Sequence, residues 1–222
     1  MSSDLCRSCP HPNSPKVPDG SDRCFRCRTC ILKDCTSTIS KTSRDGDVFL
    51  VDDDFRVVNF DSVTGSYCKK VNRRMDLPRS ADALYCDQET LYLVEFKNGS
   101  LKETLGKRLN PKFDEEFGIN LGQRDALIEK CKDSILVCSD LWGKTTKWFR
   151  EHCVFVLVYN EGKNKSASER VSSSIRRKAR FGLSGKLKGF CVKDVLTLTE
   201  KEFSKSLLST WREAEEIAGV DA

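Results

Sequence analysis

Two carboxylates and a lysine stand at spacings that would bring them together on one β-hairpin. The apolar segments 80–86 and 90–97 are separated by a short polar stretch, which predicts antiparallel strands joined by a turn. With a symmetric turn, Asp82 lies opposite Glu95 on one face, and their Cβ atoms are about 5 Å apart. Lys97 is two residues beyond Glu95 and therefore shares that face.

Facing carboxylates repel each other, and a divalent cation between them would remove the repulsion. Lys97 could then orient or deprotonate a water molecule at the metal, or stabilise charge on a phosphoryl group. A strand that ends in Glu-x-Lys is also common on exposed sheet surfaces. The apolar run before Glu95 favours a buried strand and a functional role. If Lys97 is the only nearby positive group, its loss destabilises the metal-free protein, whereas loss of one carboxylate relieves repulsion.

A second set of potential ligands lies in the first 35 residues. It consists of Cys6, Cys9, Cys24, Cys27, Cys30 and Cys35. The first four form two CxxC pairs separated by 14 residues, a spacing that resembles zinc-ribbon and short treble-clef modules. The last two could replace one ligand or, with His11, form a second site. An iron–sulfur cluster is the alternative, but zinc is favoured, and its binding would supply the folding energy of this segment.

A basic segment covers residues 163–193, with ten Lys or Arg and one acidic residue. Such a segment indicates a polyanionic partner or, equally, a solvated basic helix. Within it, the spacing of apolar residues predicts a helix over 168–182. The candidate nucleic-acid-binding residues there are Arg170, Arg176, Arg177, Lys178 and Arg180.

The segment 78–99, with Asp82 before an apolar strand that closes in Glu95-Phe96-Lys97, resembles the PD-(D/E)XK (restriction-endonuclease-like) nuclease superfamily. The resemblance extends over about 47–196. It implies a magnesium or manganese site with Asp82 and Glu95 as ligands and Lys97 assisting the attacking water.

The same resemblance suggests that Gln123 or Lys130, on the following helix, assists catalysis. The family usually has an acidic residue on a helix before the hairpin, but the first glutamate of this chain is Glu89. Four aspartates could substitute for that residue: Asp52, Asp53, Asp54 or Asp61. Pro78 is four residues before Asp82 rather than adjacent to it.

The elements around the motif predict an α/β domain with a mixed central sheet flanked by helices. The predicted elements are a hairpin of 48–51 and 55–60, the hairpin of 80–86 and 90–97, a helix over 121–143, a buried strand over 153–159, the helix over 168–182, a strand over 189–196, and a last helix over 197–219 that Thr199 caps. We expect a zinc module at 1–36, a linker at 37–46 and a nuclease-like domain at 47–222.

Composition agrees with an intracellular protein in a reducing compartment. None of the apolar runs in the 222 residues approaches the length of a membrane span, and no signal peptide is recognisable. We expect the six later cysteines to be small buried residues. The expected function is a nuclease that acts on DNA rather than RNA, with homodimerisation as an option. The alternative is a non-catalytic zinc protein that binds nucleic acid or a protein.

Overall fold

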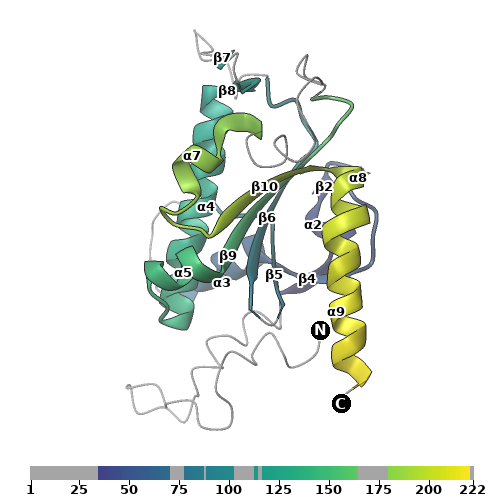
Figure 1. Ribbon diagram of the computed structural model, residues 1–222, viewed down its shortest axis with the longest axis vertical. Coiled ribbons are helices and arrows are strands. Elements are labelled where there is room, and N and C mark those ends of the chain that lie inside the picture. Colours follow the sequence, from purple (N-terminus) through teal and green to yellow (C-terminus); the bar gives the residue numbers. More distant parts are fainter. Residues whose placement is uncertain are drawn as a thin grey trace.

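A computed structural model describes residues 35–70, 78–87, 89–102, 113–114, 117–164 and 180–220. It has a mixed six-stranded sheet with helices on both faces (Figure 1). The strands are β1 (Thr36–Thr38), β4 (Arg56–Asn59), β5 (Ala83–Cys86), β6 (Leu91–Lys97), β9 (Cys153–Tyr159) and β10 (Asp194–Thr199), in that order across the sheet. The predicted α/β class is confirmed.

The sheet is antiparallel on one side and parallel on the other. Strands β1, β4, β5 and β6 are antiparallel neighbours, and β9 and β10 run parallel to β6. In the β5–β6 hairpin Ala83 pairs with Val94 and Leu84 with Leu93, which confirms the predicted register. Strand β9 is buried along its whole length, as its apolar run predicts.

Helices cover both faces of the sheet. One face carries α3 (Phe60–Lys70), α4 (Leu121–Trp142), α5 (Thr146–His152) and α7 (Ser184–Leu187), and the other carries α2 (Ile39–Thr42), α8 (Glu200–Glu202), the π-helical turn η3 (Phe203–Leu208) and α9 (Ser209–Val220) (Figure 1). Short elements complete the fold: β2 (Arg44–Asp45), β3 (Val48–Phe49), β7 (Phe113–Asp114), β8 (Ile119–Asn120) and η2 (Arg180–Gly182). Among the described helices, none is both long and apolar enough to cross a membrane.

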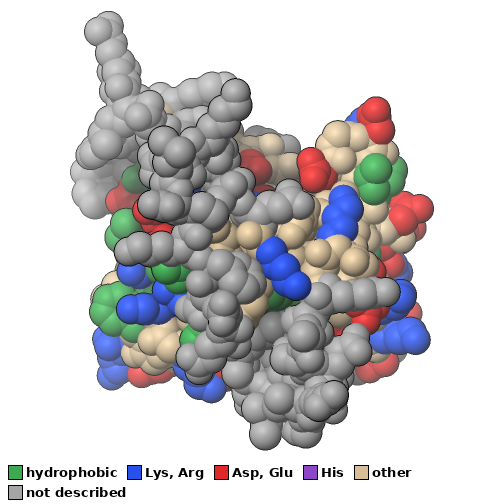
Figure 2. All heavy atoms as spheres, turned by 90° about the horizontal axis from the view of Figure 1, so that it is seen from above, with side chains coloured by type: hydrophobic (Ala, Val, Ile, Leu, Met, Phe, Trp, Pro, Cys, Tyr) green, Lys and Arg blue, Asp and Glu red, His purple; other side chains and the backbone are tan. Residues whose placement is uncertain are grey.

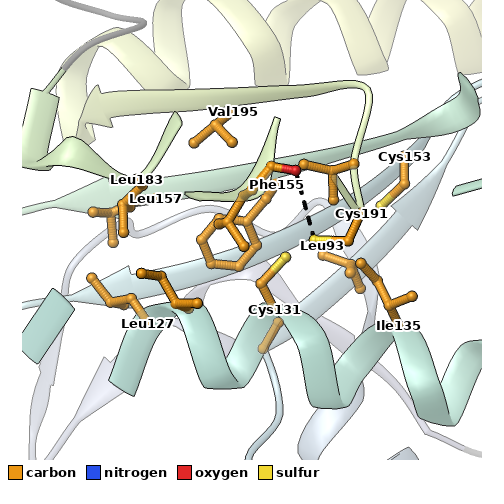
Figure 3. Close-up of a cluster of buried hydrophobic side chains, with 14 of the residues drawn as sticks. Leu93, Leu127, Cys131, Ile135, Cys153, Phe155, Leu157, Leu183, Cys191 and Val195 are labelled. Atoms are coloured by element: carbon orange, nitrogen blue, oxygen red, sulfur yellow. Dashed lines mark hydrogen bonds between the residues drawn. The ribbon is translucent and has the colours of Figure 1, made fainter. Parts of the chain in front are cut away.

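The period of two along the strands divides the core into two layers. Phe155 and Leu157 of β9 belong to the layer under α4, whereas Val156 and Val158 belong to the layer under α9. Figure 3 shows the first layer, into which α4 directs Leu127 and the neighbouring residues of its apolar stripe.

Cysteines help to fill this layer, as the sequence predicts. Cys131, Cys138, Cys153 and Cys191 are buried, and three of them are drawn together in Figure 3. Burial raises the pKa of the Cys153 thiol, so this group stays protonated and packs as a small apolar side chain. Cys68 and Cys86 are only half-buried, which corrects the prediction for these two.

Helix α4 begins and ends where its sequence directs. The Asn120 side chain accepts a hydrogen bond from the Gly122 amide at 2.9 Å and caps the first turn. Gly143 ends the helix with a φ of 63°, a left-handed conformation that glycine adopts without steric cost. The predicted helix over 121–143 is therefore confirmed.

The first predicted hairpin, 48–51 with 55–60, is wrong. Strand β3 pairs instead with β2, and β4 pairs with β1 and β5. The intervening aspartates do not form a hairpin turn, because their side chains bind other parts of the chain. Asp52 accepts a hydrogen bond from Ser40 Oγ at 3.0 Å, and Asp53 and Asp54 form ion pairs with Arg212 of α9.

The predicted linker at 37–46 is wrong as well. Its first residues extend the sheet as β1, and Ile39 is fully buried in the layer under α9. A single apolar residue among polar ones gives no periodic signal, yet its burial is enough to fix the segment on the sheet. The α/β domain therefore begins before residue 47.

The strand predicted over 189–196 is displaced toward the C-terminus. The backbone turns at Gly189, where φ is 73°, and β10 then runs from Asp194 to Thr199. The helix predicted over 168–182 lies outside the described residues except for its end, which forms the 3-10 turn η2.

Thr199 caps the last helix as predicted. Its Oγ1 accepts from the Glu202 amide at 3.1 Å, and Glu202 Oε2 accepts from the Thr199 amide at 2.9 Å, which together form a capping box. We expect Thr199→Ala to lower the free energy of unfolding by about 1 kcal/mol relative to Thr199→Ser, which keeps the cap.

Urea unfolding monitored by circular dichroism measures this difference. Thr145, the N-cap of α5, makes no side-chain capping bond and provides the matched control. Thr145→Ala should change stability by no more than a few tenths of a kcal/mol. Equal losses at the two positions would contradict the assigned role of the capping box.

Candidate active site

The predicted carboxylates and lysine lie together on the α4 face of the sheet. Leu91 and Leu93 of β6 point into the layer under α4, and Glu95 and Lys97 follow them on the same face. Asp82 immediately precedes β5, opposite Glu95 in the register of the hairpin. The side chain of Glu95 is 0% exposed.

Lys130 of α4 reaches both carboxylates. Its Nζ lies 2.8 Å and 2.9 Å from the two Glu95 oxygens and 3.3 Å from Asp82 Oδ1. Lys97 Nζ lies 3.0 Å from Glu95 Oε1. The site is thus a cluster of two carboxylates and two ammonium groups, in which Lys130 makes more contacts than Lys97.

The Ser134 side chain holds α4 against the segment that carries Asp82. Ser134 Oγ accepts from the Ala81 amide at 2.9 Å and donates to the Lys130 carbonyl at 2.6 Å. One turn of helix separates Lys130 from Ser134, so the same hydrogen bonds also position the Lys130 ammonium. Asp82 itself is fixed by the Phe96 amide, which donates to its Oδ2 at 2.6 Å.

A third carboxylate lies close by. Asp61, in the first turn of α3, accepts from Ser80 Oγ at 2.5 Å and acts electrostatically on both Asp82 and Lys130. Of the four aspartates that could substitute for the acidic residue expected upstream, Asp61 is the one beside the cluster. Asp52, Asp53 and Asp54 contact Ser40 and Arg212 instead, as described above.

Two members of the cluster, Asp82 and Lys97, line an open cleft of about 410 Å³. The charged residues that line the cleft are Lys41, Arg44, Asp45, Asp61, Asp82 and Lys97. Gln123 also lines it, so one of the two predicted assisting residues faces the cleft and the other, Lys130, bonds the carboxylates. In the view from above, Lys and Arg side chains lie beside a surface formed by the backbone and by side chains that are neither charged nor hydrophobic (Figure 2).

Burial makes the ionised form of Asp82 costly. Desolvation and the neighbouring Glu95 charge raise the pKa of Asp82 to about 8, although Lys130 and the Phe96 amide oppose the shift. The pKa of Lys130 is raised, because the attraction of Glu95 and Asp82 outweighs the effect of its burial. Asp82 is therefore protonated more readily than an ordinary aspartate, whereas Lys130 keeps its charge.

The donor set fits a hard divalent cation in part. Magnesium is commonly held by one or two carboxylates and retains several water molecules, and Asp82 and Glu95 offer that set. Within the described residues, however, no group of three or more His, Cys, Asp or Glu side chains is arranged as metal ligands. Lys130 lies within bonding distance of both carboxylates, so a cation shared by them would replace its ammonium group.

Two other predicted sites lie largely outside the described residues. These are the cysteines before Cys35 and the basic residues Arg170, Arg176, Arg177 and Lys178. Cys35 is described, and it packs beside the core layer under α4. Arg180 begins the turn η2.

Comparison of the chain with protein-family models, curated proteins and solved structures gives no match.

The sequence did not predict that residues before β4 line the cleft. Lys41 and Arg44 lie in the segment predicted as a linker, and their approach to β6 depends on the burial of Ile39. The contact of Lys130 with both carboxylates had a signal that could have been used. Lys130 is three residues after Leu127 and four before Ser134, both buried, which places it on the inward side of α4.

The expectation that Lys97 is the only positive group near the carboxylates is wrong, and the ranking of lysine variants changes with it. Lys130→Ala should lower the free energy of unfolding by about 3–5 kcal/mol, the cost of leaving a buried charge with its pairing broken. Lys97→Ala should cost about 1 kcal/mol, because Lys97 is more exposed and Glu95 keeps Lys130.

Chemical denaturation of the metal-free protein at pH 7 tests this order. Lys132→Ala, at an exposed position on the same helix, controls for the loss of a lysine from α4. A larger loss for Lys97→Ala than for Lys130→Ala would contradict the assigned geometry.

The raised pKa of Asp82 predicts a pH-dependent stability. Because its folded pKa of about 8 lies above the ordinary value of 3.8, its contribution to stability is fully present below about pH 4 and is lost as the pH rises through about 8. Asp82→Ala should therefore gain stability relative to wild type between these limits, by up to about 1.4 kcal/mol per pH unit. Urea titrations at several pH values without metal give the slope, and a difference that does not vary with pH would refute the assignment.

Proposed function

We propose that the chain is a metal-dependent nuclease that hydrolyses phosphodiester bonds, with a restriction-endonuclease-like core. The observation that carries the proposal is the pair of facing carboxylates: Asp82 lines the cleft, Glu95 beside it is fully buried, and Lys130 binds both. Burying two acids in contact opposes folding, and such arrangements concentrate at functional sites.

The side chains would divide the work according to their positions. Asp82 and Glu95 would hold a magnesium or manganese ion, which when bound lowers the pKa of water and offsets developing phosphoryl charge. Lys97, which lines the cleft and is partly exposed, is placed to orient the attacking water or to stabilise negative charge on the phosphate. Gln123 shares the cleft and could position the same water or the phosphate.

Lys130 would have a dual role. In the metal-free state its ammonium group binds both Glu95 and Asp82. Its positive charge offsets the repulsion between the two acids, so that the fold can accommodate them. With a cation in place, the Lys130 ammonium would no longer bond the carboxylates directly, although it would stay near the site. Asp82 would at the same time release its proton, because only a carboxylate is a ligand.

The parts of the chain outside the catalytic cluster would contribute binding. We assign a structural zinc site to the cysteines between Cys6 and Cys35, and phosphate contacts to the basic segment around Arg170–Arg180. DNA is the preferred polymer, on the resemblance to the nuclease superfamily, and a homodimer is compatible with the proposal. Buried protonated thiols such as Cys153 agree with a reducing, intracellular setting.

A second function has one observation in its favour. Lys130 makes three contacts of 3.3 Å or less with the two carboxylates, so the cluster is satisfied without a metal. A nuclease-like domain with its acids permanently neutralised would act as a binding module for nucleic acid or protein. The two functions differ in whether a cation displaces Lys130.

Cleavage assays with magnesium or manganese decide between them. The proposal predicts cleavage of at least one of single-stranded DNA, duplex DNA and RNA by the wild type. Glu95→Gln and Asp82→Asn should reduce cleavage to background, and Lys97→Ala should lose cleavage but still bind metal, since Lys97 is not a ligand. Asp125→Asn, at an exposed position of α4, is the control and should cut as the wild type does.

Metal binding measured by titration calorimetry provides the complementary readout. In buffers of different ionisation enthalpy, the wild type should release protons as it binds the ion and Asp82→Asn should release fewer, because the raised pKa of Asp82 favours its protonated form. Absence of both metal binding and cleavage across the substrates would reject the nuclease and favour the binding module. Cleavage that survives in Glu95→Gln would show that the activity resides elsewhere.

A further inference from the structure

The hairpin of β2 and β3 exposes apolar side chains at the edge of the cleft. Four large hydrophobic residues are exposed within the described part of the chain, and two of them, Val48 and Phe49, are the residues of β3. The Phe49 side chain is 42% exposed. The other two, Leu136 and Phe190, lie on α4 and in the turn after α7, away from the residues that line the cleft.

Phe49 is a direct neighbour of a residue that lines the cleft. It pairs with Arg44 across the hairpin, and the Arg44 guanidinium carbon lies 5.8 Å from the centre of the Phe49 ring. Arg44 is held in place by its Nε, which donates to the Gly46 carbonyl at 2.7 Å, and by an ion pair with Asp47 at 2.9 Å. The ring and the guanidinium group therefore form a preorganised pair beside the cleft.

The hairpin is anchored to the core by the residues that follow Phe49. Leu50 and Val51, the next two residues, are buried in the layer under α9. Ser43 binds both of them, since its carbonyl accepts from the Leu50 amide at 3.2 Å and its Oγ donates to the Val51 carbonyl at 3.0 Å. The core thus anchors the base of the hairpin and leaves the aromatic ring available for a ligand.

The charges of the cleft limit what that ligand can be. Three basic residues line it, Lys41, Arg44 and Lys97, but three acidic residues line it too. Attraction for phosphates alone is therefore modest, and an additional contact that does not depend on charge is needed. An exposed aromatic ring beside an arginine supplies such a contact for an unpaired nucleobase, whose face stacks on it irrespective of sequence.

We propose that Phe49 and Arg44 form a stacking platform for an unpaired nucleotide of a single-stranded nucleic acid at the edge of the cleft. The base stacks on Phe49, and its phosphate lies near Arg44 and Lys41. This assignment rests on the proposed function only in taking nucleic acid as the ligand. It deepens that function by selecting single strands or unpaired ends over intact duplex.

Binding measured without metal tests the platform independently of cleavage. The full-length protein is titrated, in EDTA, into fluorescently labelled single-stranded DNA, single-stranded RNA and a duplex of the same sequence, and anisotropy is recorded. Phe49→Ala should weaken single-strand binding at least about fivefold, the factor for 1 kcal/mol of base stacking, and should affect duplex binding less. Phe49→Trp keeps a ring and should retain the wild-type affinity.

A matched pair on another surface provides the control. Phe190 is 67% exposed, and the centre of its ring lies 5.5 Å from Lys132 Nζ. The pair repeats the aromatic–cation arrangement, but neither residue lines the cleft. Phe190→Ala and Lys132→Ala should leave single-strand affinity unchanged. Arg44→Ala should reduce the dependence of log K on log salt by about 0.7, the value for one phosphate on a single strand, whereas Phe49→Ala should leave this slope unchanged.

Each outcome decides the inference. Equal affinities for Phe49→Ala and Phe190→Ala, or equal weakening for single strands and duplex, would overturn it. Failure of the wild type to bind any of the three polymers would overturn it too, and would point to a protein partner for the exposed hairpin. If the platform binds as expected and the wild type cleaves nothing with metal, only the nuclease proposal fails.

Discussion

A carboxylate with no exposed surface on a central strand is the constraint around which the cleft is organised. Glu95 lies on β6, between β5 and β9, and Leu93 and Leu157 are apolar neighbours on the same face. An ionised carboxylate there needs both charge compensation and hydrogen bonds. Lys130 and Lys97 supply the positive charge, and Lys130 also donates hydrogen bonds to both Glu95 oxygens.

Helix α4 meets this requirement while it builds the core. Its residues Leu127 and Cys131 pack on the sheet, and Lys130 between them carries charge to the same face. Ser134 joins the helix to the chain beside Asp82, so helix packing and the position of the ammonium are coupled. A shift of α4 that left the apolar contacts intact would still break the cluster, because hydrogen bonds tolerate less displacement than apolar contacts.

The sequence was informative where a local rule determines the structure. The register of the β5–β6 hairpin follows from the period of two and a short turn, and this alone placed Asp82 beside Glu95. The cap of the last helix likewise followed from Thr199.

The predictions from sequence failed where long-range contacts determine the structure. Asp53 resembles a turn residue, but its partner Arg212 is 159 residues away. Ile39 gives no periodic pattern, although its burial brings Lys41 and Arg44 to the cleft. Asp61 reaches the cluster because α3 packs next to β5, which no local spacing reveals. Such residues are selected by the assembled fold rather than by their neighbours in the chain.

Under the proposed function, the same cluster would serve either catalysis or simple binding. A proton on Asp82, the Lys130 ammonium and a divalent cation all compete for the same carboxylate oxygens. Raising the pH removes the first competitor while Lys130, whose pKa is raised, keeps its charge. Displacement of Lys130 is therefore the decisive step, and it becomes easier if an anionic ligand in the cleft offers the ammonium a new partner. A phosphate near Lys97 would do so, because the negative charge brought by the ligand replaces the carboxylates that Lys130 gives up. On this reasoning, substrate and metal would bind cooperatively, and a protein that holds neither would keep its acids neutralised.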